Sequence, residues 1–535
     1  SAIFAISILL LNSFFIGNFL VKLIKFRFHH PFYSFLTSLA LGIDFFVIVS
    51  YVCGLLGCFS SPFLKYLMIL CALLLVIYFS IKNSSKTSLF LKKLRKDAPF
   101  LIVFSILALF FAGNTFCLPV CWDELSYQLA VPLRWLNDGK ISFYADNPYS
   151  IFPGTGSYIF LLCIYLGGIT APRLFIWFLW MLSIICMYEF LKPGFLRFYA
   201  VVFSFSFGLS YAVMVCGSAA YVEMIILLHL IVSIALLKEK KWHPDPKTYI
   251  ILGILCGIAS SVKLTGLIIG FSFFIFFLAF CFVFNKVSIK SVITYLFVCL
   301  ILMLAFYLRP FLETGNPLYP YFAGIFSDQI NELEMSHYHH LIGAEKYGID
   351  GIIGFLFSPF LLGLPINAFD GNFGYQLILN ITFAMLSFFI LLKQKKWKSI
   401  FVAFYFLTVF YVFWFFTSKQ ARFFIPVAFF VFLAGKTFLI HKNKLKTILV
   451  FVAVFFIFWC FPDILWDYFK TSWKVATGNM RQVDFVYSGT GEGYLQAMDL
   501  IRTKTPKDSK FLLLFENRGL YMPRKYEIGT PFLQG

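Results

Sequence analysis

The sequence predicts an all-α polytopic membrane protein with about 14 transmembrane helices and a small α/β domain at its C-terminal end. Of the 535 residues, 60% are hydrophobic and only 13% are charged. The mean hydropathy is +0.85. Long apolar runs recur along the chain, and in lipid such runs satisfy their backbone polar groups only as helices. This composition excludes a soluble globular protein.

Lysine and arginine cluster in short segments between the apolar runs, which marks these segments as cytoplasmic. They also explain the net charge of +19. Because this charge follows the topology instead of forming one patch, we expect no nucleic-acid partner. The basic segments are 22–27, 82–96, 192–197, 238–247, 286–290, 393–398 and 442–446.

The apolar runs are long enough to cross a hydrocarbon core, which takes about 20 helical residues. Segment 148–168 is the exception, because Pro148 and Pro153 would interrupt a helix and a crossing here would put the basic segment 238–247 outside. We expect it to be re-entrant or to lie in the outer interface. The predicted spans are 2–21, 33–57, 63–81, 98–117, 171–191, 198–216, 219–237, 248–266, 267–285, 291–308, 374–392, 399–417, 423–440 and 447–464.

The chain divides into three parts. Residues 1–97 form an N-terminal set of additional transmembrane helices, and residues 98–464 form a transmembrane module with large outer loops at 118–170 and 309–373. The tail, 465–535, is more polar and lies outside in this topology.

The tail contains a helix-like stretch at 493–503 and a strand-like stretch at 511–515. We therefore expect a small α/β domain on the outer face, truncated at the C-terminal end.

Two cysteine pairs, Cys53/Cys58 and Cys117/Cys121, fall near predicted outer helix ends. A disulfide in either pair would suit an oxidising compartment. Reduced thiols that act as small packing residues are equally compatible with the sequence.

Polar residues that are rare in such an apolar chain gather on the predicted outer face. Acidic groups there can deprotonate an acceptor or hold a metal, and basic groups can bind a phosphate. The residues are Asp123 and Glu124 at the start of the first large outer loop, Glu223 in the first turn of a span, Lys263 in a Gly/Ser-rich break between spans, Arg309 at the end of a span, and Arg422 at the start of another.

Five of these residues also have a purely structural interpretation. Asp123 suits the N-cap of an interfacial helix, and Lys263 suits a side chain that extends along the interface toward water. Arg309 and Arg422 suit interfacial anchors, and Glu223 could pair with one of them. Their shared location favours a functional site over five separate structural roles.

A second candidate is a metal site in the loop 309–373. His337, His339 and His340 lie close to two glutamates, and imidazole and carboxylate groups suit zinc or manganese. Glu124 is a further candidate ligand. The histidine spacing matches no specific metal motif, so a solvated loop remains the alternative.

Several short motifs, taken together in order, resemble the GT-C glycosyltransferases that use polyprenyl-phosphate sugars, a group that includes protein O-mannosyltransferases and the lipid A aminoarabinose transferase. The resemblance covers roughly residues 98–430 and continues weakly into the tail. The motifs are Trp-Asp-Glu-Leu-Ser-Tyr at 122–127, Leu-Asn-Asp-Gly-Lys-Ile at 136–141, Phe-Pro-Gly at 152–154, Tyr-Val-Glu at 221–223, Val-Lys-Leu-Thr-Gly at 262–266, Thr-Gly-Asn-Pro-Leu-Tyr-Pro at 314–320, Arg-Phe-Phe-Ile-Pro at 422–426 and Glu-Asn-Arg-Gly-Leu-Tyr at 516–521.

The resemblance implies an inverting glycosyltransferase of the bacterial inner membrane with its site on the periplasmic face. The enzyme would move a sugar from a polyprenyl-phosphate donor to a lipid, glycan or protein acceptor, with Asp123 as general base. Glu124 would position substrate or a divalent metal. Lys263, Arg309 and Arg422 would bind the lipid phosphate.

The chain departs from the family in two respects. Glu223 stands where the family often carries aspartate, and it would contribute to substrate binding with a longer side chain. The additional N-terminal spans mark a distinct subfamily or a module that binds a protein partner.

Three other functions fit parts of the sequence. A polysaccharide ligase or polymerase would use diphosphate-linked donors, a transporter would use broken helices to line a pathway, and a non-catalytic assembly subunit could share the fold.

Overall fold

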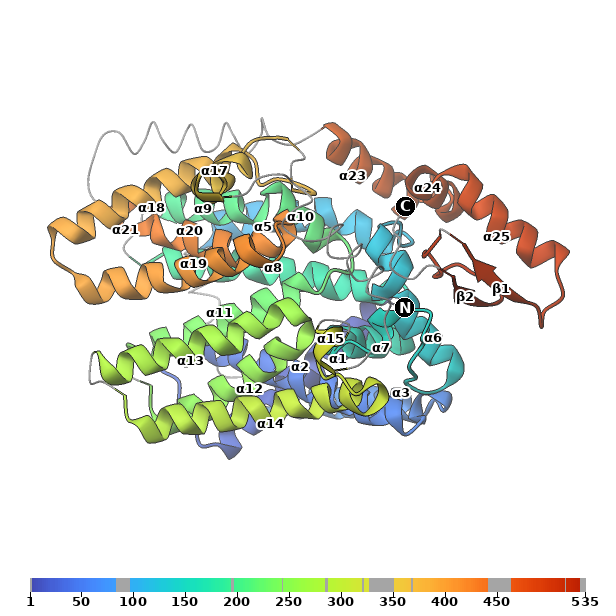
Figure 1. The fold of residues 1–535 in the computed structure, drawn as a ribbon, viewed down its shortest axis with the longest axis horizontal. Coiled ribbons are helices and arrows are strands. Elements are labelled where there is room, and N and C mark those ends of the chain that lie inside the picture. The colour runs from blue at the N-terminus through green and yellow to red at the C-terminus, as the bar shows by residue number, and fades with distance from the viewer. Residues whose placement is uncertain are drawn as a thin grey trace.

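The computed structural model describes residues 2–82, 97–193, 197–242, 244–283, 287–319, 322–326, 351–366, 369–440, 463–514 and 516–529. This part of the chain is mainly helical and contains one two-stranded sheet near its C-terminal end. The long helices lie side by side in one bundle, and the C-terminal elements gather at one end of it (Figure 1). The predicted class, a polytopic helical membrane protein with a small α/β tail, is confirmed.

Eight helical segments in the described residues are long and apolar enough to cross a membrane. They are α1 (Ala2–Leu23), α2 (Pro31–Leu55), α8 (Ala171–Leu191), the segment Leu264–Phe282 that contains α13 (Leu267–Phe282), α14 (Ile289–Thr314), α18 (Tyr375–Lys393), α19 (Trp397–Thr417) and the segment Ala421–Phe438 that contains α20 (Ile425–Ala434) and the start of α21 (Lys436–Ile440).

The remaining helices in the described residues are shorter or less apolar than these eight segments. The number of segments that could cross a membrane is therefore below the expected number of about 14. The predicted span 447–464 lies almost entirely outside the described residues. The other helices before the tail are α3 (Phe63–Lys82), α5 (Ala98–Ala112), α6 (Ala130–Asp138), α7 (Thr155–Gly167), α9 (Arg197–Gly208), α10 (Tyr211–Ser218), α11 (Glu223–Glu239), α12 (Pro246–Val262), α15 (Ala323–Phe326) and α17 (Gly351–Leu361).

The prediction of one continuous span over 198–216 is wrong. The helix breaks after Gly208, and α9 and α10 are bent by 67° relative to each other. Ser210 adopts an extended backbone at the break. The backbone N–H of Ala212 donates to the carbonyl oxygen of Asn372, so the loop before α18 stabilises the bend.

Two further expectations are corrected between residues 309 and 373. Arg309 does not end a span, because α14 continues through Pro310 to Thr314 and ends at Gly315, which has a positive φ of 73°. The region 309–373 is also not a simple loop, because it contains the apolar helix α17.

Segment 148–168 begins with irregular backbone and becomes helical at Thr155. The resulting helix α7 has 13 residues, about 20 Å at 1.5 Å per residue, which is too short for a membrane crossing of about 30 Å. Most of its residues are buried, and it packs against α1, α2, α6 and α8.

The N-terminal helices are part of the same bundle. Helix α2 packs against α7 and α11, and the carboxylate of Asp44 lies 2.7 Å from Nε2 of His229 on α11. Both side chains are fully buried. The protein-partner role expected for residues 1–97 stays a prediction.

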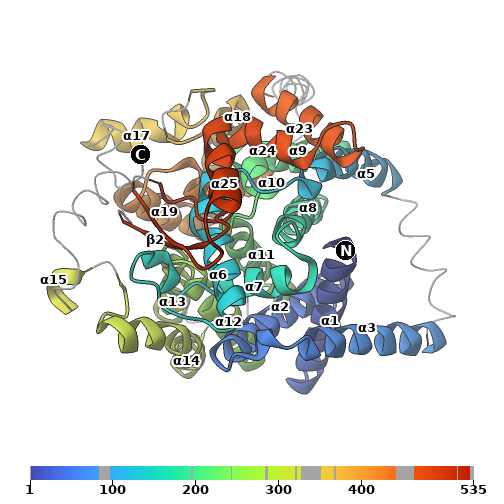
Figure 2. The ribbon, with the colours of Figure 1, turned by 90° about the vertical axis from the view of Figure 1, so that its right-hand side faces the viewer.

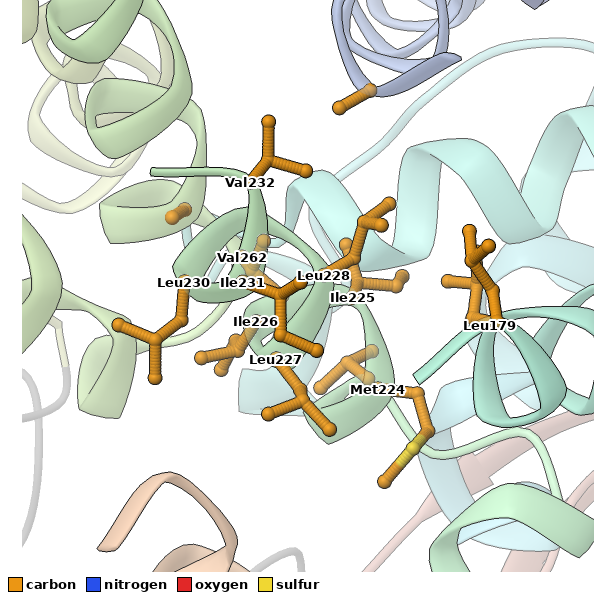
Figure 3. Packing of buried hydrophobic residues seen from close by; sticks show 14 of the residues in the cluster. Leu179, Met224, Ile225, Ile226, Leu227, Leu228, Leu230, Ile231, Val232 and Val262 are labelled. Carbon is orange, nitrogen blue, oxygen red and sulfur yellow. The ribbon is translucent and has the colours of Figure 1, made fainter. Parts of the chain in front are cut away.

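Helix α11 lies near the centre of the bundle (Figure 2). Its apolar side chains point outward on all sides, as Figure 3 shows for the segments 224–228 and 230–232. Leu179 of α8 and Val262 of α12 belong to the same packed cluster. A helix that is apolar all round needs neighbours on every face. This packing places Glu223, the first residue of α11, inside the protein.

The tail combines three helices with a small parallel sheet. Leu513 of β1 pairs with Ile528 of β2. The predicted helix-like and strand-like stretches correspond to α25 and β1. The elements are α23 (Asp463–Ala476), α24 (Gln482–Thr490), α25 (Glu492–Lys504), β1 (Lys510–Leu513) and β2 (Lys525–Ile528).

Helices α1 and α2 cross with their backbones in close contact. Ser13 and Gly17 of α1 face Ser38 and Gly42 of α2. Each helix therefore contributes two small residues that are four positions apart. Small residues at this spacing allow membrane helices to approach closely.

Replacement of Gly42 by alanine should destabilise the protein. A Cβ atom at Gly42 would overlap the carbonyl oxygen of Ser13 and force the helices apart, which typically costs about 1–3 kcal/mol. Thermal unfolding in detergent measures the effect. The matched control is Gly493→Ala, where a Cβ meets nothing within 4 Å; equal melting temperatures for both variants would contradict the packing argument.

Candidate active site

Asp123 directly precedes a short π-helical turn, Glu124–Gln128. Its side chain makes no capping hydrogen bond, so the N-cap interpretation does not hold. Instead, the Tyr127 hydroxyl donates to Asp123 Oδ2 at 2.8 Å. The π-helical turn places these two residues, four apart in sequence, on the same side. Such turns occur frequently at functional sites.

Arg422 reaches the same carboxylate from the other end of the chain. Its Nη1 donates to Asp123 Oδ2 and forms an ion pair across 299 residues of sequence. Arg422 Nε donates to Gln420 Oε1 at 3.0 Å, and Gln420 Nε2 donates to Asp370 Oδ2 at 3.2 Å. The guanidinium is therefore oriented by a second chain of hydrogen bonds.

Lys263 has an extended backbone conformation and lies between α12 and α13, where the helix is interrupted. Its Nζ is 3.4 Å from Glu223 Oε1 and 4.2 Å from the ring centre of Phe423. The other carboxylate oxygen of Glu223 is buried without a hydrogen-bond partner among the described residues. The break predicted from the Ser-Ser-Val-Lys-Leu-Thr-Gly sequence thus brings Lys263 to the acidic residues.

A cavity of about 120 Å³ joins these groups. Asp123, Lys263 and Arg422 line it, together with polar and aromatic side chains. The other lining residues include Tyr127, Gln128, Tyr149, Phe152, Ser157, Thr265, Ser418, Gln420 and Phe423.

A second cavity and an apolar groove lie next to this cavity. A smaller cavity of about 30 Å³, which Glu223 lines, shares Thr265, Arg422 and Phe423 with it. This smaller cavity in turn shares Ile268 and Phe413 with an apolar groove of about 730 Å³ between α13, α14 and α19. The charged cavity therefore lies close to an apolar groove whose lining includes the exposed side chains of Phe271, Leu300 and Val412.

Two opposing effects act on the Asp123 carboxyl. Burial raises its pKa, but the positive charges of Arg422 and Lys263 and the hydrogen bond from Tyr127 outweigh burial, so the pKa lies below its ordinary value. Burial lowers the pKa of Lys263, against the charge of Glu223. Asp123 is therefore held in its ionised form.

Glu124 turns away from the cavity and is fully buried. Its Oε1 is 3.2 Å from Nε of the equally buried Arg173, and it accepts hydrogen bonds from the backbone N–H groups of Ala220 and Cys121. Both carboxylate oxygens of Glu124 are engaged in these contacts, so Glu124 holds the loop in place. This role differs from the predicted one, in which Glu124 positions substrate or a metal.

Arg309 lies apart from the cavity. Its Nη1 donates to the carbonyl oxygen of Ser150 at 3.1 Å, and its guanidinium lies 5.6 Å from the ring centre of Trp135. Arg309 thus supports the segment that carries Tyr149. The structure brings together Asp123, Glu223, Lys263 and Arg422 from the predicted set, but not Arg309.

The described residues contain no group of three His, Cys, Asp or Glu side chains that could hold a metal. His337, His339 and His340 lie outside the described residues, so the predicted histidine site stays a prediction. Neither Cys53/Cys58 nor Cys117/Cys121 forms a disulfide.

Tyr127, Gln420 and Arg173 are not among the site residues predicted from the sequence. Tyr127 had a usable signal, since it follows Asp123 by four residues in a helix-like stretch. Arg173 also had a signal, because an arginine in an apolar span is rare. The structure shows that its side chain is fully buried.

No family model matches the chain, and no curated protein matches it at a significant level. Among solved structures, the chain is similar to the crystal structure of ArnT from Cupriavidus metallidurans bound to undecaprenyl phosphate. The TM-score is 0.50 at 13% sequence identity, over 80% of this chain and 86% of ArnT. The chain is an integral membrane protein with an ArnT-like fold.

Replacement of Glu124 by glutamine should reduce stability. The change leaves the buried Arg173 without its carboxylate, and loss of one partner of a buried pair typically costs about 3–5 kcal/mol. Folded yield in size-exclusion chromatography and the melting temperature measure the loss. The control is the exposed Glu492→Gln on α25. A Glu124→Gln protein that folds normally but has lost activity would instead favour a role on substrate.

Proposed function

We propose that the protein is a membrane glycosyltransferase that moves a sugar from a polyprenyl-phosphate donor to an acceptor at the outer face of the membrane. The observation that carries this proposal is the cavity in which Asp123, Lys263 and Arg422 meet, close to an apolar groove. A carboxylate, two cations and an apolar surface for the lipid are what this reaction needs in one place.

The two cations suit the phosphate of the donor. A sugar linked to polyprenyl phosphate carries a phosphodiester with one negative charge, and the departing phosphate monoester carries a second. Arg422 and Lys263 are already oriented by Gln420 and Glu223 before any ligand binds. Preorganised charges of this kind usually supply the largest catalytic contribution.

The apolar groove suits the polyprenyl chain. It runs between α13, α14 and α19 and is lined almost entirely by apolar residues such as Phe271, Leu300 and Val412. The ArnT structure with the similar fold contains undecaprenyl phosphate. We propose the same class of lipid for this chain, with its phosphate at Arg422 and its chain in the groove.

Asp123 is proposed as the general base. The acceptor oxygen or nitrogen attacks the anomeric carbon while the bond from that carbon to the phosphate oxygen breaks. The acceptor proton passes to Asp123, and polyprenyl phosphate leaves with the bonding electrons. A bound phosphate would compete with Asp123 for Arg422, so donor binding would also release the carboxylate for this step.

We propose that this cavity faces the periplasm of a bacterium. The connection between α18 and α19, with its basic segment 393–398, lies at the opposite end of the bundle from α6 and the tail (Figure 1). Basic connections mark the cytoplasmic side. A donor that is anchored in the bilayer would then meet a lipid, glycan or protein acceptor on the far side.

Replacement of Asp123 by asparagine should abolish transfer. The substitution keeps the size of the side chain but removes its ability to take a proton, and a general base typically contributes 10²–10⁴-fold. Mass spectrometry of lipid-linked sugars and outer-face glycans in cells measures transfer, and native mass spectrometry with undecaprenyl phosphate checks donor-lipid binding. Undiminished transfer would defeat the assignment.

The matched control for this experiment is Asp499→Asn, because Asp499 is exposed on α25 away from the cavity. Transfer by this variant should equal that of the unmodified protein.

The pH dependence should report the cations around Asp123. Because the pKa of Asp123 lies below its ordinary value, the base form persists as the pH falls, and the acid limb of kcat/KM should lie below that of an ordinary aspartate. Lys263→Met removes one cation near Asp123, so less positive charge opposes the effect of burial, and the pKa of Asp123 rises. The acid limb of kcat/KM should therefore move to higher pH. Lys474→Met, an exposed change on α23, is the control. An unmoved limb would contradict this electrostatic account.

A further inference from the structure

We infer that Arg173 is a positioning residue for Asp123, and that Tyr468 of α23, in the tail, helps to hold Arg173 in place. This inference deepens the proposed function and rests on it, because it concerns the placement of the proposed base.

Arg173 is fully buried and is surrounded by hydrogen-bond acceptors. Its Nη1 donates to the carbonyl oxygen of Cys117 at 2.8 Å and to that of Leu118 at 3.2 Å. Its Nη2 donates to Tyr468 Oη at 2.9 Å and to Asn114 Oδ1 at 3.3 Å. Burial of a guanidinium is costly unless it is paired, and here both Nη atoms donate hydrogen bonds while Nε lies beside the Glu124 carboxylate.

These contacts lie on both sides of Asp123 in sequence. Asn114, Cys117 and Leu118 precede Asp123, and Glu124, the carboxylate partner of Arg173, follows it directly. Arg173 itself belongs to the rigid helix α8. The loop that carries Asp123 is therefore attached to α8 before and after the carboxylate.

The tail binds the same loop at further points. Gln482 accepts from the backbone N–H of Leu118 at 3.0 Å and donates to the carbonyl oxygen of Phe116 at 2.8 Å. The N–H of Leu520 donates to the carbonyl oxygen of Leu125 at 3.0 Å. Figure 2 shows α25 and the strands in front of the end of the bundle that bears α6 and α7.

Together these bonds determine where Asp123 stands relative to Arg422, which approaches from a different part of the bundle. A displacement of a reacting group by about 1 Å can cost as much as 10²-fold in rate. The tail is therefore part of the site, although none of the tail residues lines the Asp123 cavity described above.

The test is Tyr468→Phe in the full-length protein, which removes one hydroxyl and keeps the ring. We expect kcat for transfer to fall by about 10-fold to 100-fold, while KM for the polyprenyl-phosphate sugar stays within about twofold, because Arg422 and Lys263 are untouched. Hydrogen exchange of the backbone amides in 114–128 should rise. The control is Tyr66→Phe, an exposed tyrosine on α3.

A destabilised variant separates positioning from general destabilisation. Gly42→Ala, which should destabilise the protein at the contact between α1 and α2, should leave both kcat per folded molecule and exchange in 114–128 unchanged, whereas Tyr468→Phe should change both. Unchanged hydrogen exchange in 114–128 would overturn the inference, as would raised exchange with unchanged kcat. If Asp123→Asn itself leaves transfer intact, the proposed function fails, and the exchange measurement still decides whether Tyr468 holds the loop.

Discussion

The ion pair between Asp123 and Arg422 is the interaction on which the site depends. Removing two charges from water is costly, and close contact with well-placed hydrogen bonds has to compensate for it. Tyr127 supports the carboxylate and Gln420 supports the guanidinium. A pair made this way requires that both backbones are held firmly, since a small displacement would leave a charge buried without its partner.

That requirement explains the organisation around the pair. Helix α11 is surrounded by apolar neighbours and gives Glu223 a fixed place, and the interrupted backbone between α12 and α13 directs Lys263 to it. On the other side, Arg173 and the tail hold the loop of Asp123. Packing in the bundle thus provides the rigidity, and the irregular segments provide the functional groups.

Sequence patterns predicted those parts of this arrangement that depend on local chemistry. Apolar length identified most helices within a few residues, as with α8 at Ala171–Leu191. Prolines and glycines correctly marked the irregular start of segment 148–168, and the Gly/Ser-rich stretch marked the break at Lys263. The break in α9 and α10 was missed, because Asn372, which stabilises it, comes from a loop far along the chain.

The sequence by itself determined the class of the protein, its helices and the end of the bundle at which unusual polar residues gather, since hydropathy and charge act locally. Only the tertiary structure decided which of those residues meet. Asp123 and Glu124 are neighbours in the chain, yet one faces the cavity and the other faces Arg173. Arg309 and Arg422 were both predicted to bind the lipid phosphate, but Arg309 contacts Ser150 instead. Partners that lie hundreds of residues apart are chosen by helix packing, and no local pattern encodes that choice.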